Sequence, residues 1–335
     1  MAKLNMSGWI KNVISQKKTI AIPVLTHPGI EKIGKTVKEA VCDGNVHYEA
    51  IKYLSDNYPS AAATVIMDLT VEAEAFGSDI IFPENEVPSV NGRLVSNEQE
   101  IDSLEVPSLE AGRIPEYLRA NILAARNISD KPVLAGCIGP FSLAGRLFDM
   151  SEIMVLPYTN EKAARTLLEK CTDLILRYCV ALKATGVNGV LMAEPAAGLL
   201  SNDDCYKLSS VYVKKIIDAV QDDSFAVILH NCGNNGQCTE AMIKTGAAGY
   251  HFGNKIDMVQ ACRDVPSDCL AMGNLDPVQV FKQQSAAEVK AETLRLLNLT
   301  KDFPNFVISS GCDIPPHTPI ENIDAFYEAV EEFNR

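Results

Sequence analysis

The chain has 335 residues, 47% of them hydrophobic and 22% charged, which is typical of a globular protein with a large core. Its net charge of −13 argues against a nucleic-acid partner and gives no basic patch for a membrane surface. No stretch resembles a signal peptide or reaches the roughly 18 apolar residues of a membrane span. We therefore expect a cytoplasmic protein without a membrane segment, whose ten cysteines are reduced.

The first part of the chain predicts a helix followed by strands that alternate with helices. Residues 1–18 form an amphipathic pattern, which predicts an N-terminal helical extension at the bottom of the fold. A polar segment, residues 83–110, interrupts the alternation, and a loop of this length is either functional or an insertion. Short apolar runs rich in β-branched residues predict strands at 19–27, 61–68, 78–82 and 131–139.

The second part of the chain shows a more regular alternation of strands and helices. Strands spaced by helices predict βα units and a parallel sheet. Eight or nine strands, without a GxGxxG or Walker A pattern, favour a (β/α)8 TIM barrel over an open doubly wound sheet. We expect a single barrel domain over residues 1–335. The strands are expected at 188–195, 225–231, 247–252, 269–274 and 305–311, and helices at 160–186, 203–221, 237–246, 285–300 and 319–333.

Polar residues stand at the C-terminal ends of the predicted strands, where the active sites of such barrels lie. Four of the five histidines fall at or just after a strand end, the fourth being His317 in the last loop. This pattern predicts a functional site at the mouth of the barrel. The residues at the strand ends are His27, Asp68, Glu194, His230, His251, Asn274 and Cys312.

A metal site is the strongest chemical signal among these residues. His230 and Cys232 are two positions apart, so on an extended chain their side chains point the same way. Imidazole and thiolate are ligands that zinc prefers, and Cys312 follows the last strand directly. Three protein ligands with one open position are typical of a catalytic zinc. The alternative is a buried histidine bonded to a carbonyl, together with two inert thiols.

Five stretches of the chain resemble the uroporphyrinogen decarboxylase superfamily, and within it the zinc-dependent methylcobamide:coenzyme M methyltransferase branch. The resemblance implies a (β/α)8 barrel and a Zn²⁺ site whose ligands are His230, Cys232 and Cys312. The stretches are DLTVEAEAFG (68–77), GPFSLAG (139–145), HNCG (230–233), GNLDPV (273–278) and SSGCDIPPHTPIENIDAF (309–326).

The resemblance also implies a reaction and its partners. We expect methyl transfer from a protein-bound methylcobamide to a zinc-activated small thiol such as coenzyme M. Corrinoid-binding domains of such systems carry an Asp-x-His-x-x-Gly motif, and no histidine here has that context. The methylcobamide is therefore expected to arrive on a separate corrinoid protein that docks at the barrel mouth. The acidic segment 83–110 is either a docking surface or a solvated loop.

Three other functions remain open at this point. Relatives in the superfamily catalyse the reverse type of reaction, in which a small methylated substrate loads the corrinoid protein. A uroporphyrinogen decarboxylase is less favoured, because the first strand and its continuation, residues 20–35, lack the arginines that bind a substrate with many carboxylates. A non-catalytic module that binds a corrinoid protein has no need for two thiols and an imidazole at strand ends.

Other polar residues at the mouth receive roles in catalysis or binding, each with a structural alternative. Glu194 is a candidate fourth zinc ligand or a hydrogen-bond acceptor behind the ligands, and His251 either orients substrate or is a structural hydrogen-bonder. We also expect Asn274 and His317 to contact the cofactor, although Asn274 suits a strand-end turn equally well. Of Glu72 and Glu74, one is expected to face the site.

Overall fold

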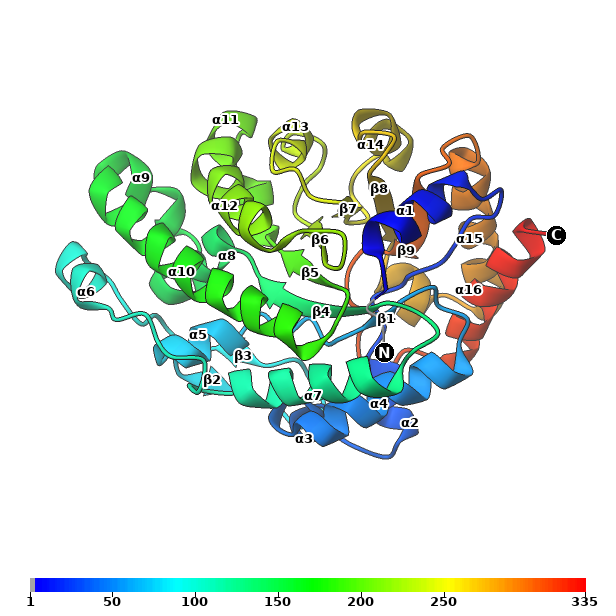
Figure 1. Cartoon of the computed structure of the whole chain (residues 1–335), viewed down its shortest axis with the longest axis horizontal. Coiled ribbons are helices and arrows are strands. Elements are labelled where there is room, and N and C mark those ends of the chain that lie inside the picture. Colours follow the sequence, from blue (N-terminus) through cyan, green and yellow to red (C-terminus); the bar gives the residue numbers. More distant parts are fainter. Residues whose placement is uncertain (1–3) are drawn as a thin grey trace.

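The protein, described by a computed structural model over residues 4–335, is built round a curled parallel sheet (Figure 1). The strands follow one another round this sheet in the order β1-β4-β5-β6-β7-β8-β9, and each pairing is parallel. Helical connections return the chain to the starting end of the sheet, so the sheet consists of βα units. The strands are β1 (Ala63–Thr64), β4 (Val133–Ile138), β5 (Gly189–Ala193), β6 (Ala226–Asn231), β7 (Gly249–Phe252), β8 (Leu270–Leu275) and β9 (Phe306–Ser310).

An extended segment, residues 20–25, joins the two edges of the sheet. Ile22 N donates to Ile308 O at 3.0 Å, which places the segment beside β9. On the other side, Ala21 O accepts from Ala61 N at 2.9 Å, just before β1 begins. The segment therefore occupies the eighth strand position, and the predicted (β/α)8 architecture is confirmed.

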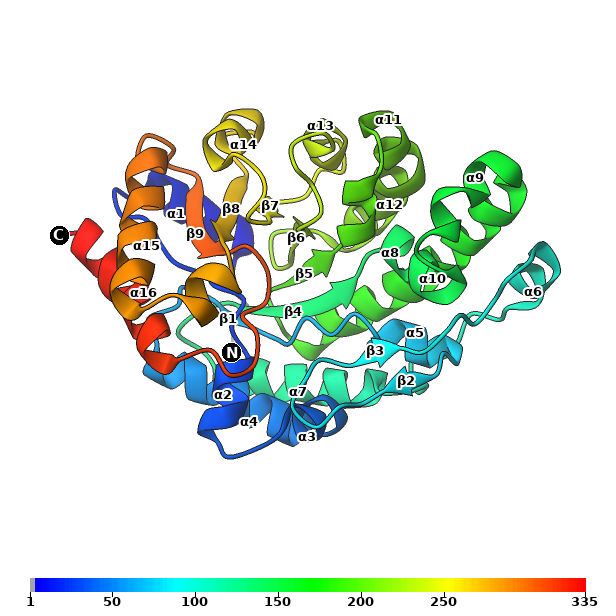
Figure 2. The same cartoon turned by 180° about the vertical axis from the view of Figure 1, so that it is seen from behind.

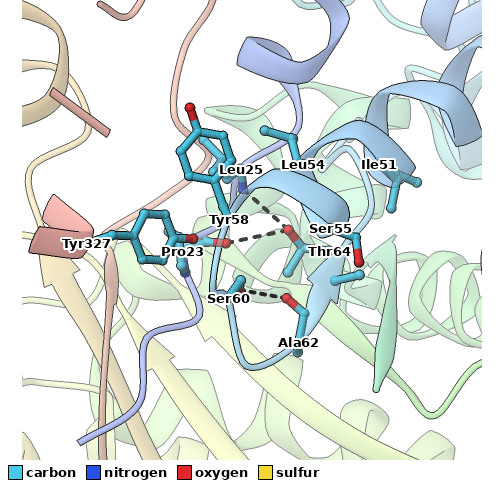
Figure 3. Close-up of a pocket in the computed structure, with 11 residues that line it drawn as sticks. Pro23, Leu25, Ile51, Leu54, Ser55, Tyr58, Ser60, Ala62, Thr64 and Tyr327 are labelled. Carbon is cyan, nitrogen blue, oxygen red and sulfur yellow. Dashed lines mark hydrogen bonds between the residues drawn. The ribbon is translucent and has the colours of Figure 1, made fainter. Parts of the chain in front are cut away.

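Side-chain hydrogen bonds replace part of the backbone ladder along this closing seam (Figure 3). Thr64 Oγ1 accepts from Leu25 N at 3.3 Å and donates to Pro23 O at 3.5 Å. Since proline has no N–H, a regular strand pairing is interrupted at Pro23. The barrel is therefore closed by a less regular interaction here than between β4 and β9.

Three predicted strands near the start of the chain were wrong in extent or in place. The strand predicted at 19–27 is reduced to a single bridge, and its last residue begins helix α2. The strand predicted at 61–68 is regular only over β1. The strand predicted at 78–82 contributes β2 (Ile80–Ile81), which pairs antiparallel with β3 (Ser89–Val90) in a separate hairpin.

Helices line the outside of the sheet in both views (Figures 1 and 2). The long helices predicted in the second part of the chain are confirmed, and the segment predicted to be a polar loop at 83–110 carries β3 and α6. None of the described helices is both long and apolar enough to cross a membrane. The helices are α1 (Met6–Ser15), α2 (His27–Lys32), α3 (Val37–Cys42), α4 (Gly44–Asn57), α5 (Val71–Phe76), α6 (Glu98–Ser103), α7 (Ile114–Asn127), α8 (Pro140–Phe148), α9 (Leu156–Thr159), α10 (Glu161–Thr185), α11 (Asn202–Cys205), α12 (Val211–Val220), α13 (Thr239–Ile243), α14 (Met258–Asp264), α15 (Ala286–Thr300) and α16 (Ile320–Phe333).

Helix α1 packs against residues from the interior of the barrel. The N-terminal helix predicted at 1–18 is confirmed over α1, and residues 1–3 lie outside the described part of the chain. Asn5 caps this helix by accepting a hydrogen bond from Gly8 N. One buried cluster joins the helix to strand residues, and it includes Met6, Ile10, Val13, Leu191 and Ile228.

A buried charged network holds the loop after β1 against helix α7. Arg113 pairs with Asp68 at 2.5 Å and with Glu74 at 2.6 Å, and it donates to Thr70 Oγ1 at 2.7 Å. Tyr117 donates a further hydrogen bond to Asp68 at 2.9 Å. Only 7% of the Arg113 side chain and 1% of the Asp68 side chain are exposed, so neither charge is solvated outside this network.

Replacing this arginine is expected to destabilise the barrel. Arg113→Met leaves the Asp68 carboxylate buried without its cation, which should lower the free energy of unfolding by about 3–5 kcal/mol. Urea denaturation measures the change. Lys214→Met is the control, because its pair with Asp218 is exposed and should contribute less than about 1 kcal/mol. Equal losses in the two variants would contradict the assigned role of the buried network.

Candidate metal centre

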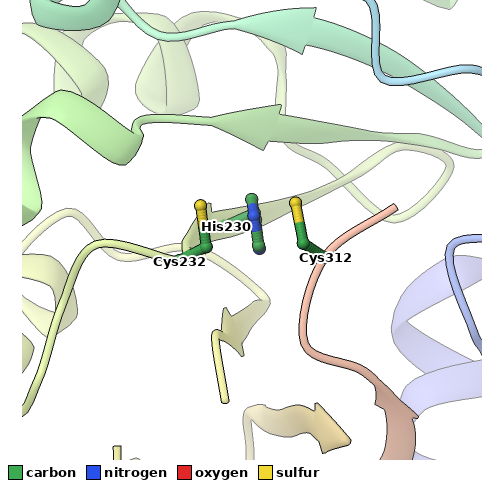
Figure 4. A group of neighbouring side chains, drawn as sticks. All are labelled: His230, Cys232 and Cys312. Atoms are coloured by element: carbon green, nitrogen blue, oxygen red, sulfur yellow. The ribbon is translucent and has the colours of Figure 1, made fainter. Parts of the chain in front are cut away.

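Three potential metal ligands meet at the C-terminal end of the barrel. His230 is the second-last residue of β6, and Cys232 is the first residue after that strand. Cys312 lies two residues beyond the end of β9. The nitrogen and sulfur ligand atoms all lie within 4.8 Å of one another. His230 is fully buried, whereas both cysteines are partly exposed. Figure 4 shows the imidazole between the two sulfur atoms. Residues about eighty positions apart in sequence thus form one donor set.

Strand alternation explains how His230 reaches this position. Ala226 and Ile228 belong to the buried cluster that contains interior residues of the barrel, and His230 is the next residue of the same parity. The loop after β6 then approaches the loop after β7 closely. A Cβ atom on Gly253 would lie 2.7 Å from Cys232 Cα, so only glycine fits there without a shift.

The imidazole of His230 contacts a second imidazole, that of His251. His230 Nδ1 lies 2.6 Å from His251 Nδ1, and the parallel register places these two residues side by side on β6 and β7. His251 Nε2 lies 2.8 Å from Ser309 Oγ, which donates to Ile22 O at 2.7 Å. His230 Nε2 is buried and has no hydrogen-bond partner among residues 4–335. That nitrogen is therefore available to a metal ion.

The two cysteines of the cluster differ in acidity. Interaction with the Cys312 thiol, and then with His230, lowers the pKa of Cys232 to about 4 in spite of burial. The neighbouring Cys232 and burial raise the pKa of Cys312 well above its usual value. The contact between the two thiols thus lowers the pKa of one and raises the pKa of the other. Such a pair of sulfurs, one of them a thiolate, is suited to a dication that replaces the remaining proton.

Glu194 lies beside the cluster but uses its carboxylate for a different contact. Its backbone N donates to His230 O at 2.8 Å. Oε1 accepts from Ser142 N at 2.6 Å and from Ser142 Oγ at 2.7 Å, and Oε2 accepts from Phe141 N at 3.2 Å. Burial raises the pKa of Glu194 to about 7, although these hydrogen bonds lower it. The carboxylate therefore caps helix α8, and its role as a fourth zinc ligand stays a prediction.

The loop that carries Cys312 is attached to helix α2 at two points. His27 Nε2 lies 3.4 Å from Asp313 Oδ2, and the His27 side chain is buried. Further along, His317 N donates to Glu31 Oε1 at 2.6 Å, and His317 Nδ1 lies 3.2 Å from the same oxygen. His317 has a positive φ of 62° and an exposed side chain. Contact between His317 and a cofactor stays a prediction.

Asn274 supports the wall of the site. Its Nδ2 donates at 3.0 Å to Gly253 O and at 3.0 Å to Ile256 O, and so ties β8 to the loop after β7. Since Gly253 packs against Cys232, the amide holds the backbone on which that thiol rests. The structural alternative for Asn274, a turn at the strand end, agrees with these contacts, and its predicted contact with a cofactor stays a prediction.

Two further polar residues were missed from the sequence. Ser309 completes the contact behind His251, but serines inside strands give no local signal for such a role. Arg146 on α8 is half-buried, and no salt bridge or hydrogen bond joins its side chain to another described residue. Burial lowers the pKa of Arg146, while the charge of Asp68 raises it. A partly buried guanidinium without a carboxylate partner is suited to binding an anion.

Comparisons with known proteins agree with this fold. A family model for uroporphyrinogen decarboxylase (URO-D) matches residues 12–333. The chain belongs to the uroporphyrinogen decarboxylase family. Methylcobamide:CoM methyltransferase MtbA from Methanosarcina mazei is 30% identical over 276 residues, which cover 81% of this chain and 80% of that protein. The resemblance predicted from the sequence is thereby confirmed.

More distant relatives include enzymes of the decarboxylase type. A uroporphyrinogen decarboxylase from Solibacter usitatus is 26% identical over 281 residues, which cover 81% of this chain and 79% of that protein. Among solved structures, a methyltransferase from Methanosarcina mazei is similar with a TM-score of 0.88 and 23% identity, and the match covers 99% of each chain. This structural similarity confirms the fold of the family over nearly the whole chain.

The predicted pair Glu72 and Glu74 separates into two environments in this family member. Glu74 pairs with Arg113 and is partly exposed. Glu72 is buried, and its Oε1 accepts from Ile138 N at 3.0 Å at the end of β4. Its Oε2 has no partner among the described residues. Burial raises the pKa of Glu72 to about 8.

This shift predicts a pH dependence of stability. Between pH 4.5 and about 8 the folded chain keeps a proton on Glu72 that the unfolded chain has lost. The free energy of unfolding should therefore fall as pH rises through this window, by at most about 1.4 kcal/mol per pH unit. Glu72→Gln cannot ionise and should be more stable than the wild type at pH 8 but not at pH 5.

Urea denaturation between pH 5 and pH 8 measures this difference. Glu49→Gln, on the exposed face of α4, is the matched control and should follow the wild type. A constant difference between Glu72→Gln and the wild type over the whole range would contradict a protonated Glu72.

Proposed function

We propose that the chain is a zinc-dependent methyltransferase that moves a methyl group from a protein-bound methylcobamide to a small thiol. His230, Cys232 and Cys312 would hold the ion. The observation that carries the proposal is their convergence within 4.8 Å in a family member 30% identical to a methylcobamide:CoM methyltransferase. The corrinoid protein and the thiol are the proposed partners.

The residues of the site fit such an ion. His230 Nε2 is a buried nitrogen without a hydrogen-bond partner in the described part of the chain, and the His230 side chain forms one cluster with two sulfur atoms. Imidazole and thiolate are donors typical of zinc, and three protein ligands leave one position for a substrate. Bound there, Zn²⁺ would keep a substrate thiol deprotonated while its sulfur stays nucleophilic.

The transfer balances without an added oxidant or reductant. The thiolate sulfur of the substrate forms a bond to the methyl carbon, and the carbon–cobalt bond breaks. Its electron pair stays on cobalt, so methyl-Co(III) becomes Co(I), and the thiol proton is released to solvent. The task of this chain is to bind and orient the thiol and to present its sulfur at the mouth of the barrel, where a corrinoid protein has access.

The anionic end of a substrate such as coenzyme M requires a cation, and we propose Arg146 for this role. Arg146 follows Ser142 by four residues, so both lie on one face of α8. Ser142 contacts Glu194, whose backbone N is bonded to His230 O. The first turn of the helix thus lies next to the metal ligands, and the guanidinium lies about one turn further on.

Two alternative functions have less support. The reverse reaction, demethylation of a small methyl donor to load a corrinoid protein, uses the same ligands with zinc as a Lewis acid on the donor. A uroporphyrinogen decarboxylase would act on a polycarboxylate, and residues 19–35, which close the barrel and begin the α2 region, contain no arginine. The relative of that type is also less similar, at 26% identity.

Removal of single ligands should abolish metal retention without unfolding the chain. Cys232→Ala and Cys312→Ala change partly exposed side chains at the barrel mouth, so each variant should keep its circular dichroism and lose zinc from about one per chain. Cys269→Ala is the control, because that thiol lies outside the cluster. Unfolding of both ligand variants would instead favour a structural zinc.

Methyl transfer itself should be visible with free methylcobalamin as donor. We expect decay of the methyl-Co(III) absorption that depends on both enzyme and thiol. Arg146→Met should raise KM for an anionic thiol about tenfold or more, with little effect on a neutral thiol of the same length. Equal effects on the two thiols would contradict the role of Arg146. An unchanged methylcobalamin spectrum would favour the reverse reaction, to be assayed with methyl donors and Co(I).

A further inference from the structure

We propose that Ser309 and His251 are positioning residues that fix the tautomer of His230. They do so through a series of hydrogen bonds that starts at the backbone carbonyl of Ile22. The proposal rests on the proposed function, since it concerns how His230 is presented to the metal. The contacts form one chain: Ile22 O to Ser309 Oγ at 2.7 Å, Ser309 Oγ to His251 Nε2 at 2.8 Å, and His251 Nδ1 to His230 Nδ1 at 2.6 Å.

The positions of the protons in this series of hydrogen bonds follow from the Ile22 carbonyl at its end. The Ile22 carbonyl can only accept, so the single hydroxyl proton of Ser309 is directed to it. Ser309 Oγ then accepts from His251 Nε2–H. Neutral His251 has a lone pair at Nδ1, and that lone pair accepts from His230 Nδ1–H. The lone pair of His230 is left at Nε2, the ring nitrogen that has no hydrogen-bond partner among the described residues.

The opposite assignment leaves buried groups without partners. A proton on His230 Nε2 would be a buried donor, and no hydrogen bond joins that nitrogen to a described residue. Ser309 would have to turn its hydroxyl toward His251, and the Ile22 carbonyl would lose its hydrogen bond. Unsatisfied buried polar groups are unfavourable, so these contacts select one tautomer before any metal binds.

Neutral residues suit this position for an electrostatic reason. Histidines that bind metals commonly donate to a carboxylate or to a backbone carbonyl. A carboxylate behind His230 would add a buried negative charge next to two cysteines that become thiolates when a metal is bound. His251 and Ser309 are fully buried and provide the acceptor without a charge.

The chain of contacts also spans the closing seam of the barrel. Ile22 belongs to the extended segment that joins the sheet edges, Ser309 to β9, His251 to β7 and His230 to β6. The orientation of a metal ligand thus depends on a backbone carbonyl two hundred residues earlier. Loss of Ser309 should loosen His230 while leaving the cysteines in place.

The tautomers can be measured directly in the metal-depleted full-length chain. The chain has five histidines, so a long-range ¹⁵N–¹H correlation spectrum of ¹⁵N-histidine-labelled protein is sparse enough to assign. We expect a proton on Nδ1 of His230 and on Nε2 of His251. In Ser309→Ala the spectrum of His230 should show averaging between tautomers. A wild-type His230 that carries its proton on Nε2 would overturn the proposal.

Metal affinity gives a second readout that does not depend on activity. Ser309→Ala should lower the zinc affinity about 10–100-fold in competition with a chromophoric chelator. Ser310→Ala is the matched control: Ser310 is the next residue, equally buried, and its hydroxyl accepts from Val24 N instead. Affinity close to that of the wild type is expected for Ser310→Ala, and equal losses in the two variants would overturn the proposal.

Replacement of His251 separates positioning from packing. His251→Asn keeps an oxygen acceptor near the place of Nδ1, and His251→Leu does not. The asparagine variant should recover part of the zinc affinity that the leucine variant loses. Identical zinc affinities of the two variants would overturn the proposal. If the wild-type chain binds no zinc at all, the proposed function fails. The measured tautomers of His230 and His251 would still test whether Ser309 and His251 fix the tautomer of His230.

Discussion

The alternation of side chains along β6, combined with its register to β7, is the constraint on which the site depends. Every second residue of β6 points into the barrel, so the interior changes from Ala226 and Ile228 to His230 at the last inward position. The parallel register pairs His230 with His251 on the next strand. A slip of β6 by one residue would turn His230 to the helix side of the sheet and would remove the imidazole from the cluster.

The strands that carry the site were the most predictable part of the fold. From β4 to β9, continuous apolar runs end in polar residues at the barrel mouth, and this pattern is local in sequence. The first two strands were predicted too long, because their pairing is supplied partly by side chains such as Thr64 and is interrupted at Pro23. Ile80 and Ile81 have a strand-like composition but pair with a hairpin partner, a choice that only tertiary context makes.

The candidate ligands and His251 could be named from sequence, whereas Ser309, which contacts His251, could not. His230, Cys232 and Cys312 are unusual residue types at strand ends, and their spacing is visible in one dimension. The contact between His251 and Ser309 joins β7 to β9 across the strand between them, so it depends on barrel curvature. Glu194 was recognised from sequence as a polar residue at a strand end. Its hydrogen-bond partner, the first turn of α8, could not be predicted, because the contact depends on how the segment after β4 packs against the end of β5.

The charges around the cluster fit the proposed cation. Burial raises the pKa of Glu194 to about 7 and, with the nearby His230, lowers the pKa of His251 well below its usual value, so both residues tend toward their neutral forms. Negative charge is thereby concentrated on sulfur, at Cys232. A thiolate in a partly buried site needs a counter-charge, and the same cluster contains His230, whose buried Nε2 has no hydrogen-bond partner among the described residues. The proposed dication would therefore be favoured by the uncharged state of the neighbouring residues as well as by its three candidate ligands.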